Sequence, residues 1–284
     1  MKLSEAFYMR QIDKALHSAP VISTEDHPKL VLFSDCHRGN GTWSDSFLNN
    51  KTIYEAALGY YFERGFTYIE LGDGDELWEN RSFSDIEEIH SDIFKLLDKF
   101  CNTGRMYMLW GNHDRIKSHR NFKSASLPPS SEALIIQCSG AGGSIRYNLI
   151  HGHQADFLNN QLWKLARWLV RYIWKPLELA GIKDPTSAAR NYSKGKLIEK
   201  RMADWAELNH THLITGHTHR PTLSHNKGDW SYANTGSCVH PSTITCLEID
   251  TGTISLIKWA ACADDNQYIH ICRYVIIGPV TFCD

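Results

Sequence analysis

Residues 29–37 read Lys29-Leu30-Val31-Leu32-Phe33-Ser34-Asp35-Cys36-His37, an apolar run that ends in two side chains able to bind a metal ion. Short, continuous apolar runs rich in β-forming residues are typical of strands buried on both faces of a sheet. The arrangement recurs along the chain: residues 66–71 precede Gly72-Asp73, 106–110 precede Gly111-Asn112-His113-Asp114, 147–150 precede His151-Gly152-His153, and 212–215 precede Gly216-His217-Thr218-His219. Side chains just past the carboxyl ends of such strands meet in one crevice, so we expect the five motifs to form a single site.

The donors in these motifs are carboxylate and amide oxygens and imidazole nitrogens. A set of this kind without thiolate suits Mn, Fe or Zn, and we expect two divalent metal ions that share a ligand, with Mn favoured. Two metal ions a few ångströms apart are a common device for in-line displacement at phosphorus. Cys36 lies between Asp35 and His37, but in an extended segment its side chain points away from theirs, which favours a buried structural cysteine.

Helical patterns separate the early strands. Residues 47–64 and 83–100 carry apolar side chains at three- and four-residue spacings, which predicts βαβ units and an α/β fold. Strand-like pieces follow at 231–234, 244–249, 253–259 and 268–277, with a hairpin expected at Asp250-Thr251-Gly252. We interpret these pieces as a second sheet packed on the first, with helices outside.

Length and composition fit one domain spanning residues 1–284, since 284 residues are enough to bury a large core. A net charge of −2 gives no reason to expect nucleic acid as a partner. The 8 cysteines lack C-x-x-C pairs, and we interpret them as reduced thiols. The chain begins without the apolar region of a signal peptide and has no run long enough to cross a bilayer, so a cytoplasmic location is expected.

We interpret residues 154–210 as a helical cap insertion, because the segment begins and ends beside candidate metal ligands. It is locally basic and rich in tryptophan, with Lys164, Arg167 and Arg171 on one helical face. One interpretation is a solvated helix packed on the core. The other is a cap whose basic groups bind phosphate and whose apolar face receives lipid or contacts a membrane peripherally, on its inner face, through residues 157–177. The sequence leaves both open.

The five motifs in this order resemble those of the calcineurin-like metallophosphoesterases over roughly residues 29 to 250. The resemblance implies a four-layer α/β/β/α sandwich of two mixed sheets and a dinuclear metal centre. It also implies the ligands: Asp35, His37 and His219 for the first ion, Asn112, His151 and His217 for the second, and Asp73 as the bridge. In this scheme a metal-bridging hydroxide attacks phosphorus.

The same resemblance implies that His113 lies beside the substrate, either as the acid that protonates the leaving group or as a group that stabilises it. Glu76 and Asp114 are both candidates to orient His113. In the family the orienting acid commonly lies three residues after the bridging aspartate, a position that Glu76 occupies here.

A closer resemblance is to the UDP-2,3-diacylglucosamine pyrophosphatases of lipid A synthesis. It rests on Glu76-Leu77-Trp78 after the second motif, the long insertion, and the run Thr215 to Pro221. The chain departs from that group at His113, where well-known members have arginine, and at His153, where they have aspartate. The resemblance implies a phosphoester or pyrophosphate hydrolase acting on a nucleotide- or lipid-linked pyrophosphate such as UDP-2,3-diacylglucosamine.

Two other functions remain as alternatives. One is a phosphomonoesterase or phosphodiesterase acting on small soluble substrates or phosphoprotein. The other is a non-catalytic scaffold that has kept the fold, which the intact ligand set argues against.

The candidate substrate contacts are spread over several segments. Arg38 is interpreted as a bidentate phosphate clamp, with an ion pair to a surface acid as the alternative. His153 either reaches the substrate or donates to a carboxylate behind the ligands. The stretch 190–194 is similar in composition to a substrate-contacting stretch of the lipid A enzymes, which adds three further candidates: Asn191, Ser193 and Lys194.

Overall fold

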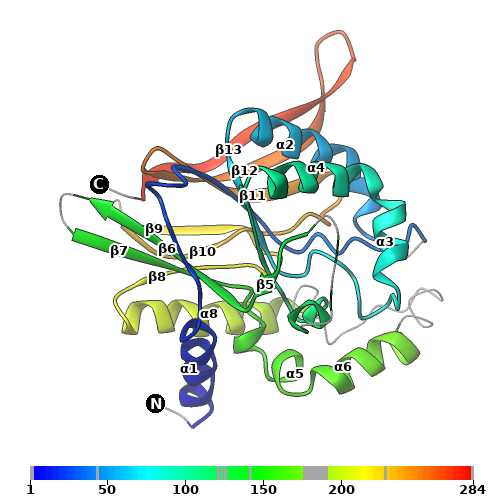
Figure 1. Cartoon of the computed structure of the whole chain (residues 1–284). Coiled ribbons are helices and arrows are strands. Elements are labelled where there is room, and N and C mark those ends of the chain that lie inside the picture. The colour runs from blue at the N-terminus through cyan, green and yellow to red at the C-terminus, as the bar shows by residue number, and fades with distance from the viewer. Residues whose placement is uncertain are drawn as a thin grey trace.

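The computed structural model describes residues 3–42, 45–119, 122, 124, 127–140, 143–174, 191–226 and 229–282. Two β-sheets stack face to face, with helices on both outer sides (Figure 1). Among the described residues, no helix is both long enough and apolar enough to cross a bilayer.

The first sheet has seven strands in the order β13-β12-β11-β2-β3-β4-β5. Its parallel part consists of β2 (Lys29–Phe33), β3 (Thr67–Leu71), β4 (Met106–Leu109) and β5 (Ser130–Ser131). Its antiparallel part consists of β11 (Thr243–Asp250), β12 (Thr253–Ala263) and β13 (Ile269–Thr281). The hairpin expected at 250–252 is confirmed, because Asp250 pairs with Thr253 across the turn.

The second sheet has six strands in the order β1-β6-β7-β8-β10-β9. They are β1 (Val21–Ser23), β6 (Ala133–Gly140), β7 (Gly143–Ile150), β8 (His212–Thr215), β9 (Thr222–Asn226) and β10 (Asp229–Asn234). The C-terminal piece expected at 231–234 does belong to this second sheet, as part of β10, but the other three expected pieces do not. The strands β11 to β13 extend the first sheet instead, because β11 pairs with β2, with Leu247 opposite Leu32.

The helices over the seven-stranded sheet follow the expected patterns with one interruption. A short 3-10 turn, Leu48–Asn50, leads into α2 (Lys51–Glu63). The single helix expected over 83–100 is two helices, α3 (Phe83–Ile89) and α4 (Ser91–Asn102). They meet at His90, a buried residue whose ring contacts Asp45 at 2.9 Å.

Three apolar clusters separate the layers. One packs α2 and α4 on the seven-stranded sheet, around residues such as Tyr61 and Phe100. The second lies between the sheets and includes Leu32, Leu149 and Ile214. The third packs α1 (Leu3–Leu16) and α8 (Tyr192–Leu208) on the six-stranded sheet. The expected four-layer α/β/β/α sandwich is therefore confirmed.

The described part of the insertion consists of several short helical segments at its start and one long helix, α8, at its end. It begins with a 3-10 turn, His153–Ala155, followed by α5 (Phe157–Asn160), α6 (Trp163–Leu169) and a π-helical turn, Val170–Trp174. Residues 175–190, which include part of the expected membrane-contacting segment 157–177, lie outside the described residues. Because Met202 and Trp205 of α8 are buried against the six-stranded sheet, α8 belongs to the outer helical layer rather than to a cap. The cap at 154–210 stays a prediction, and these contacts favour one that ends before α8.

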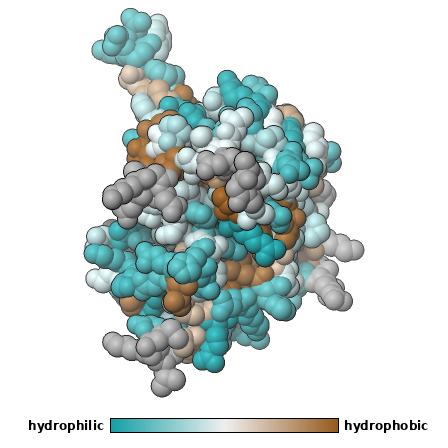
Figure 2. Space-filling model, turned by 90° about the vertical axis from the view of Figure 1, so that its left-hand side faces the viewer, coloured by the Kyte–Doolittle hydropathy of each residue, from teal (hydrophilic) through white to brown (hydrophobic). Residues whose placement is uncertain are grey.

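The hairpin of β12 and β13 projects beyond the body of the molecule at the top of Figure 1. The same projection is visible in Figure 2, where its tip is hydrophilic. A disulfide joins Cys262 to Cys272 near this end, so the prediction that all cysteines are reduced is wrong for this pair. Cys36 is a buried free thiol and packs in the cluster under α2, as a structural cysteine would.

Candidate metal centre

Most of the predicted ligands lie on strained backbone. Positive φ angles are found at five of them: Asp35, His37, Asp73, His217 and His219. Non-glycine residues seldom adopt the left-handed region, and each instance costs of the order of 1–3 kcal/mol. Such strain persists where surrounding structure holds it, and here it turns donors from separate strands toward one point.

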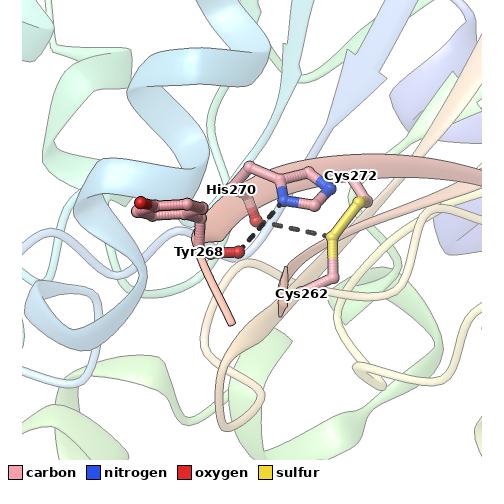
Figure 3. The surroundings of a disulfide bond; sticks show 4 residues. All are labelled: Cys262, Tyr268, His270 and Cys272. Carbon is pink, nitrogen blue, oxygen red and sulfur yellow. Dashed lines mark hydrogen bonds between the residues drawn. A yellow bond between two sulfur atoms is a disulfide. The ribbon is translucent and has the colours of Figure 1, made fainter. Parts of the chain in front are cut away.

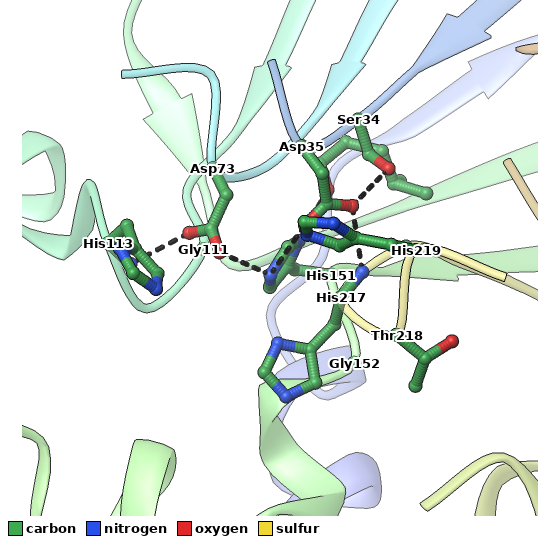
Figure 4. A network of polar contacts seen from close by, with 12 residues as sticks. Ser34, Asp35, Asp73, Gly111, His113, His151, Gly152, His217, Thr218 and His219 are labelled. Carbon is green, nitrogen blue, oxygen red and sulfur yellow. Dashed lines mark hydrogen bonds and ion pairs between the residues drawn. The ribbon is translucent and has the colours of Figure 1, made fainter. Parts of the chain in front are cut away.

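The first group of donors contains Asp35, His37 and His219, whose donor atoms lie within 4.8 Å of one another (Figure 4 shows Asp35 and His219). Asp35 Oδ1 lies 3.1 Å from His219 Nε2 and 3.7 Å from His37 Nε2. The other carboxylate oxygen, Oδ2, is already satisfied, because it accepts from the Ser34 hydroxyl and from the backbone N–H of His217. Asp35 therefore presents Oδ1 alone to the two imidazoles.

The second group contains Asp73, His151 and His217, again with donor atoms within 4.8 Å. His151 donates from Nδ1 to the carbonyl of Leu71, so its Nε2 faces Asp73 Oδ2 at a distance of 3.0 Å (Figure 4). The first group comes from the seven-stranded sheet and the loop after β8. The second comes from β3, β7 and the same loop, so the site lies across both sheets.

Several buried polar atoms at the centre make no hydrogen bond of good geometry among the described residues, although two of them, Asp35 Oδ1 and His151 Nε2, lie at ion-pair distance from a ligand neighbour. They are Asp35 Oδ1, both side-chain polar atoms of Asn112, His151 Nε2 and His217 Nε2. A buried polar group left without a partner costs roughly 1–3 kcal/mol. Metal coordination would satisfy these atoms, and all are oxygen or imidazole donors except the Asn112 nitrogen. The residues present thus fit divalent cations.

The pKa shifts of the residues at the centre also indicate a site for cations. Burial alone would lower the pKa of His151, but the carboxylates of Asp73 and Asp35 outweigh burial and raise it to about 9. Burial opposes ionisation of Asp73, yet the neighbouring histidines hold the pKa of its carboxyl far below the usual range. The site concentrates negative charge that protons on His37 and His151 balance, and a cation can replace those protons. Burial instead lowers the pKa of His217 and His219, which leaves these rings neutral and able to bind a metal ion.

His113 lies at the solvent-facing side of the centre, with 23% of its side chain exposed. Its Nδ1 lies 2.7 Å from Glu76 Oε2, and its backbone N–H donates to Asp73 Oδ1 (Figure 4 shows the second contact). Burial lowers the pKa of His113, but Glu76 and Asp73 reverse this effect and raise it. The ring stacks on Trp78 with centroids 4.2 Å apart. These contacts orient His113 and favour its protonated form.

Of the two acids expected to orient His113, the structure places only Glu76 against its ring. Asp114 instead accepts hydrogen bonds from the backbone N–H groups of Gly111, Asp73 and Gly74. It also forms an ion pair with Lys117 at 2.8 Å. Asp114 therefore joins the two loops that carry Asp73 and Asn112, and does not touch the ring of His113.

Arg38 differs from its expected role as a phosphate clamp. Its side chain is fully buried, and its guanidinium pairs with Glu70 at 2.8 Å and with Asp75 at 2.7 Å. Both carboxylates come from the β3 strand and the loop after it, and Asp75 forms a backbone bridge with Arg38 as well. A guanidinium without exposed surface ties these loops together and is not available to a phosphate.

His153 is fully buried, and neither ring nitrogen has a hydrogen-bond partner among the described residues. The expected donation to a carboxylate is therefore not seen. The ring lies between Trp110, at a centroid distance of 5.4 Å, and His151, at 5.7 Å. Burial lowers its pKa, and the nearby cationic groups add to this effect.

The basic residues of α6 and of the turn after it make two kinds of contact, with an aromatic ring or with backbone carbonyls. Lys164 and Arg167 lie over the ring of Trp163, at 5.8 and 5.0 Å from its centroid. Arg171 is half-buried and donates to the backbone carbonyls of Leu77, Trp78 and Asn80. Arg171 therefore anchors this helix to the loop that carries Glu76, and its expected phosphate contact is replaced by backbone contacts.

The three candidate substrate contacts at the start of α8 also differ in what they contact. Asn191 caps the helix, because its side chain accepts from the backbone N–H of Lys194. Ser193 faces a groove of about 1300 Å³ between α8 and the strands β8 to β10, which none of the metal ligands lines. Only Lys194 reaches the centre, through an ion pair with Asp156 at 2.8 Å.

Two residues near the centre were not singled out from the sequence. Asp156 lies 3.6 Å from His217 Nε2, and His217 and Lys194 outweigh burial to lower the pKa of Asp156 to about 2. Trp78 covers one face of the His113 ring. An acid three residues past the fourth motif was a usable signal for Asp156, whereas the stacking of Trp78 depends on how its loop folds.

A sequence profile of the family described as calcineurin-like phosphoesterase matches residues 28–221. No curated protein sequence matches the chain. Among solved structures, Vps29 from Chaetomium thermophilum is 11% identical over 88% of this chain and 97% of its own, with a TM-score of 0.40. The cold-active protein-tyrosine phosphatase of a psychrophile, Shewanella sp., is 14% identical over 91% of this chain and 82% of its own, also with a TM-score of 0.40.

Proposed function

The chain belongs to the calcineurin-like phosphoesterase family and is a metal-dependent phosphoester hydrolase, and on this premise we propose that it cleaves a nucleotide- or lipid-linked pyrophosphate such as UDP-2,3-diacylglucosamine. The observation that carries the proposal is the amphiphilic segment Phe157–Ile173, which Arg171 fastens to the loop bearing Glu76. A substrate bound at the metals would have this segment beside it.

In the proposed reaction, each residue of the centre has a defined task. Asp35, His37 and His219 would hold one ion, Asn112, His151 and His217 the other, with Asp73 shared. Divalent ions there supply Lewis acidity and lower the pKa of water, and the donor set favours Mn²⁺. Glu76 holds His113 through Nδ1 and raises its pKa, and in the protonated imidazolium Nε2 would carry the proton that goes to the leaving group.

The surface beside the centre suits an anion with a large apolar or aromatic part. Arg115 lies over both Trp110 and Trp163, at 5.2 and 5.3 Å from their centroids, and Lys164 and Arg167 add two more cations around Trp163. Charge and aromatic surface are combined here, as in sites that recognise phosphorylated amphiphiles.

The same segment supports a peripheral contact with a membrane. Its outer surface carries large apolar side chains that are substantially exposed: Phe157, Leu162, Leu165, Trp168, Tyr172 and Ile173. Apolar side chains interspersed with basic ones are typical of helices that lie on anionic lipid surfaces. We propose that the protein binds at the inner face of a membrane, where a lipid-linked substrate would reach the metals without leaving the bilayer surface.

A small soluble phosphoester is the second candidate. It is favoured by the burial of Arg38 and the backbone contacts of Arg171, because two of the expected phosphate contacts are then unavailable to a large substrate.

The two candidates differ in how they depend on Lys164 and Arg167. With Mn²⁺, the Lys164→Gln/Arg167→Gln variant should raise KM for UDP-2,3-diacylglucosamine about tenfold or more, with kcat little changed. It should leave the hydrolysis of p-nitrophenyl phosphate unchanged, because this substrate is too short to reach Trp163. Lys200→Gln, on the exposed side of α8, is the matched control. Equal and small effects on both substrates would favour the small soluble phosphoester.

A further inference from the structure

The projecting hairpin carries a second group of metal-binding side chains, outside the catalytic centre. Cys262 and His270 face each other across the β12–β13 ladder, and Cys272 lies two residues further along β13, opposite Ala260. The two sulfurs and a ring nitrogen of His270 all lie within 4.8 Å of one another. Figure 3 shows the imidazole beside the two sulfur atoms, which form a disulfide.

Backbone pairing holds these three side chains in addition to the disulfide. The β12–β13 ladder continues past Cys262 to the pair Ala263 and Ile269. Beyond it, the Asp264 carboxylate accepts from the backbone N–H groups of Asn266 and Tyr268, and the Asp264 N–H donates to the Tyr268 carbonyl. Reduction of the disulfide would therefore leave two thiols and an imidazole at nearly the same positions.

The imidazole of His270 is oriented for a ligand role. Its Nδ1 lies 3.4 Å from the Tyr268 carbonyl, to which it can donate a hydrogen bond (Figure 3). A contact of this kind on one ring nitrogen leaves the other as the lone-pair donor, as is usual for metal-bound histidines. His270 is exposed and both cysteines are partly exposed, so small reagents can reach the site.

We propose that Cys262, His270 and Cys272 form a redox-controlled site for a thiophilic divalent cation of the zinc class, and that the disulfide is its oxidised, metal-free form. Two thiolates and one imidazole match the donor preferences of Zn²⁺ and leave a fourth position for water. The catalytic centre has no thiolate, so the two sites select different ions.

The disulfide and the reduced, metal-binding form interconvert by thiol–disulfide exchange. Two molecules of a small thiol such as glutathione break the Sγ–Sγ bond, are oxidised to one small-molecule disulfide, and leave Cys262 and Cys272 as thiols. A divalent cation then displaces the two thiol protons as it binds. In the reverse direction, a small-molecule disulfide accepts the two electrons and, with two protons from the solvent, becomes two thiols, while the protein disulfide forms and the cation leaves.

The test follows Cd²⁺ by the ultraviolet charge-transfer absorption of cadmium–thiolate bonds, on the full chain whose catalytic centre has first been filled with Mn²⁺. After reduction with glutathione and removal of excess thiol, the protein should show a thiolate band that saturates at one equivalent. After oxidised glutathione the band should be absent, and renewed reduction should restore it. His270→Gln should weaken Cd²⁺ binding by at least about tenfold.

Two matched substitutions control for other side chains. Cys101→Ser removes a partly exposed free thiol and should keep the band, and His17→Gln removes an exposed histidine and should keep the affinity. The Cys262→Ser/Cys272→Ser variant should lose the band. A reduced wild-type protein without the band, or the same band in that double variant, would show that the disulfide is a structural link only. The comparison of oxidised with reduced wild type needs no variant, so it stands even where a substitution impairs folding.

Discussion

Glu76 connects a predicted metal ligand to the predicted acid. One of its oxygens lies 2.8 Å from His37 Nδ1, and the carboxylate also contacts His113 Nδ1 at 2.7 Å. Backbone N–H groups of Trp78 and Glu79 fix the carboxylate in turn. With both histidines donating from Nδ1, both Nε2 atoms are left to face the centre, so one carboxylate sets two tautomers at once.

Substitutions at Glu76 and His113 should therefore have different signatures. His113→Ala should lower kcat by roughly 10²- to 10⁴-fold with metal content near normal, because it removes only the acid. Glu76→Gln should lower kcat and also weaken metal binding, by roughly 10- to 100-fold, because it releases His37 as well. Steady-state kinetics and elemental analysis of the same samples separate these outcomes. An empty metal site in His113→Ala would mean that His113 is a ligand.

Protons should leave the centre when metal enters. In the metal-free protein the pKa of His151 is raised to about 9, above its ordinary value, so the ring is protonated at pH 7 and loses that proton above pH 9. A cation bound at Nε2 displaces this proton, so affinity should rise as the pH increases from 7 toward 9. Calorimetric titrations with Mn²⁺ in two buffers of different ionisation enthalpy should give different heats. Identical heats would show that no proton is released.

At this scale the sequence predicted the identities of the clustered donors well and their surroundings poorly. The motifs contain the donors themselves, so short-range pattern was enough to name Asp35, His37 and Asp73. The burial of Arg38 depends on Glu70 and Asp75, which lie more than thirty residues away along the chain and approach it only when β2 and β3 pair. No local pattern reveals such a contact.

Among the elements, the loop after β4 leaves no room for a side chain at its second residue, Gly111. A Cβ at Gly111 would overlap the carboxylate of Asp73, and the Gly111 N–H donates to Asp114 at 2.7 Å. Glycine therefore lets the loops after β3 and β4 approach closely enough to share a metal site.

Gly111→Ala should displace Asp73 and reduce metal content, with a corresponding loss of activity. Gly59→Ala is the matched control, because a Cβ there meets nothing within 4 Å and the residue lies inside α2, where alanine favours the helix by about 1 kcal/mol. Elemental analysis and thermal unfolding of both variants would distinguish a local effect from a general one. Normal metal content in Gly111→Ala would contradict this account of the loop.

The exposed apolar side chains of α5 and α6 lead to a prediction about binding to lipid vesicles. Because Leu165 and Trp168 are each about half exposed beside basic residues, the protein should sediment with vesicles rich in anionic lipid and less with neutral ones. Leu165→Ser/Trp168→Ser should reduce this binding severalfold. Leu208→Ser, at a still more exposed leucine on α8, should not change it. If the wild-type protein does not sediment with anionic vesicles, the proposed membrane contact is excluded.

Helices and strands were foreseeable from periodicity, but their partners were not. The residues of α2 and of β2 to β4 lie where the apolar pattern predicts them. The break at His90 results from its contact with the distant Asp45, and β11 joins the first sheet through long-range pairing with β2. The position of residues 192–208 within the insertion predicts that they belong to the cap, although their apolar face packs on the six-stranded sheet.

For the molecule as a whole, the stacking of the two sheets brings the motifs together. The loops after β2, β3 and β4 come from one sheet and those after β7 and β8 from the other, with a continuous apolar cluster between them. The resemblance of the motifs to a known family predicted this four-layer arrangement, while composition and periodicity alone predicted only an α/β fold with two sheets.

The central claim is that these loops hold two divalent cations on which phosphoester hydrolysis depends. The most direct measurement is elemental analysis combined with hydrolysis of p-nitrophenyl phosphate, before chelation, after chelation and after Mn²⁺ is restored. Two ions per chain are expected, with activity lost on their removal and recovered on their return, and with neither ion count nor activity recovered in Asp73→Ala. A protein free of metal that still hydrolyses the ester at the original rate would contradict the claim.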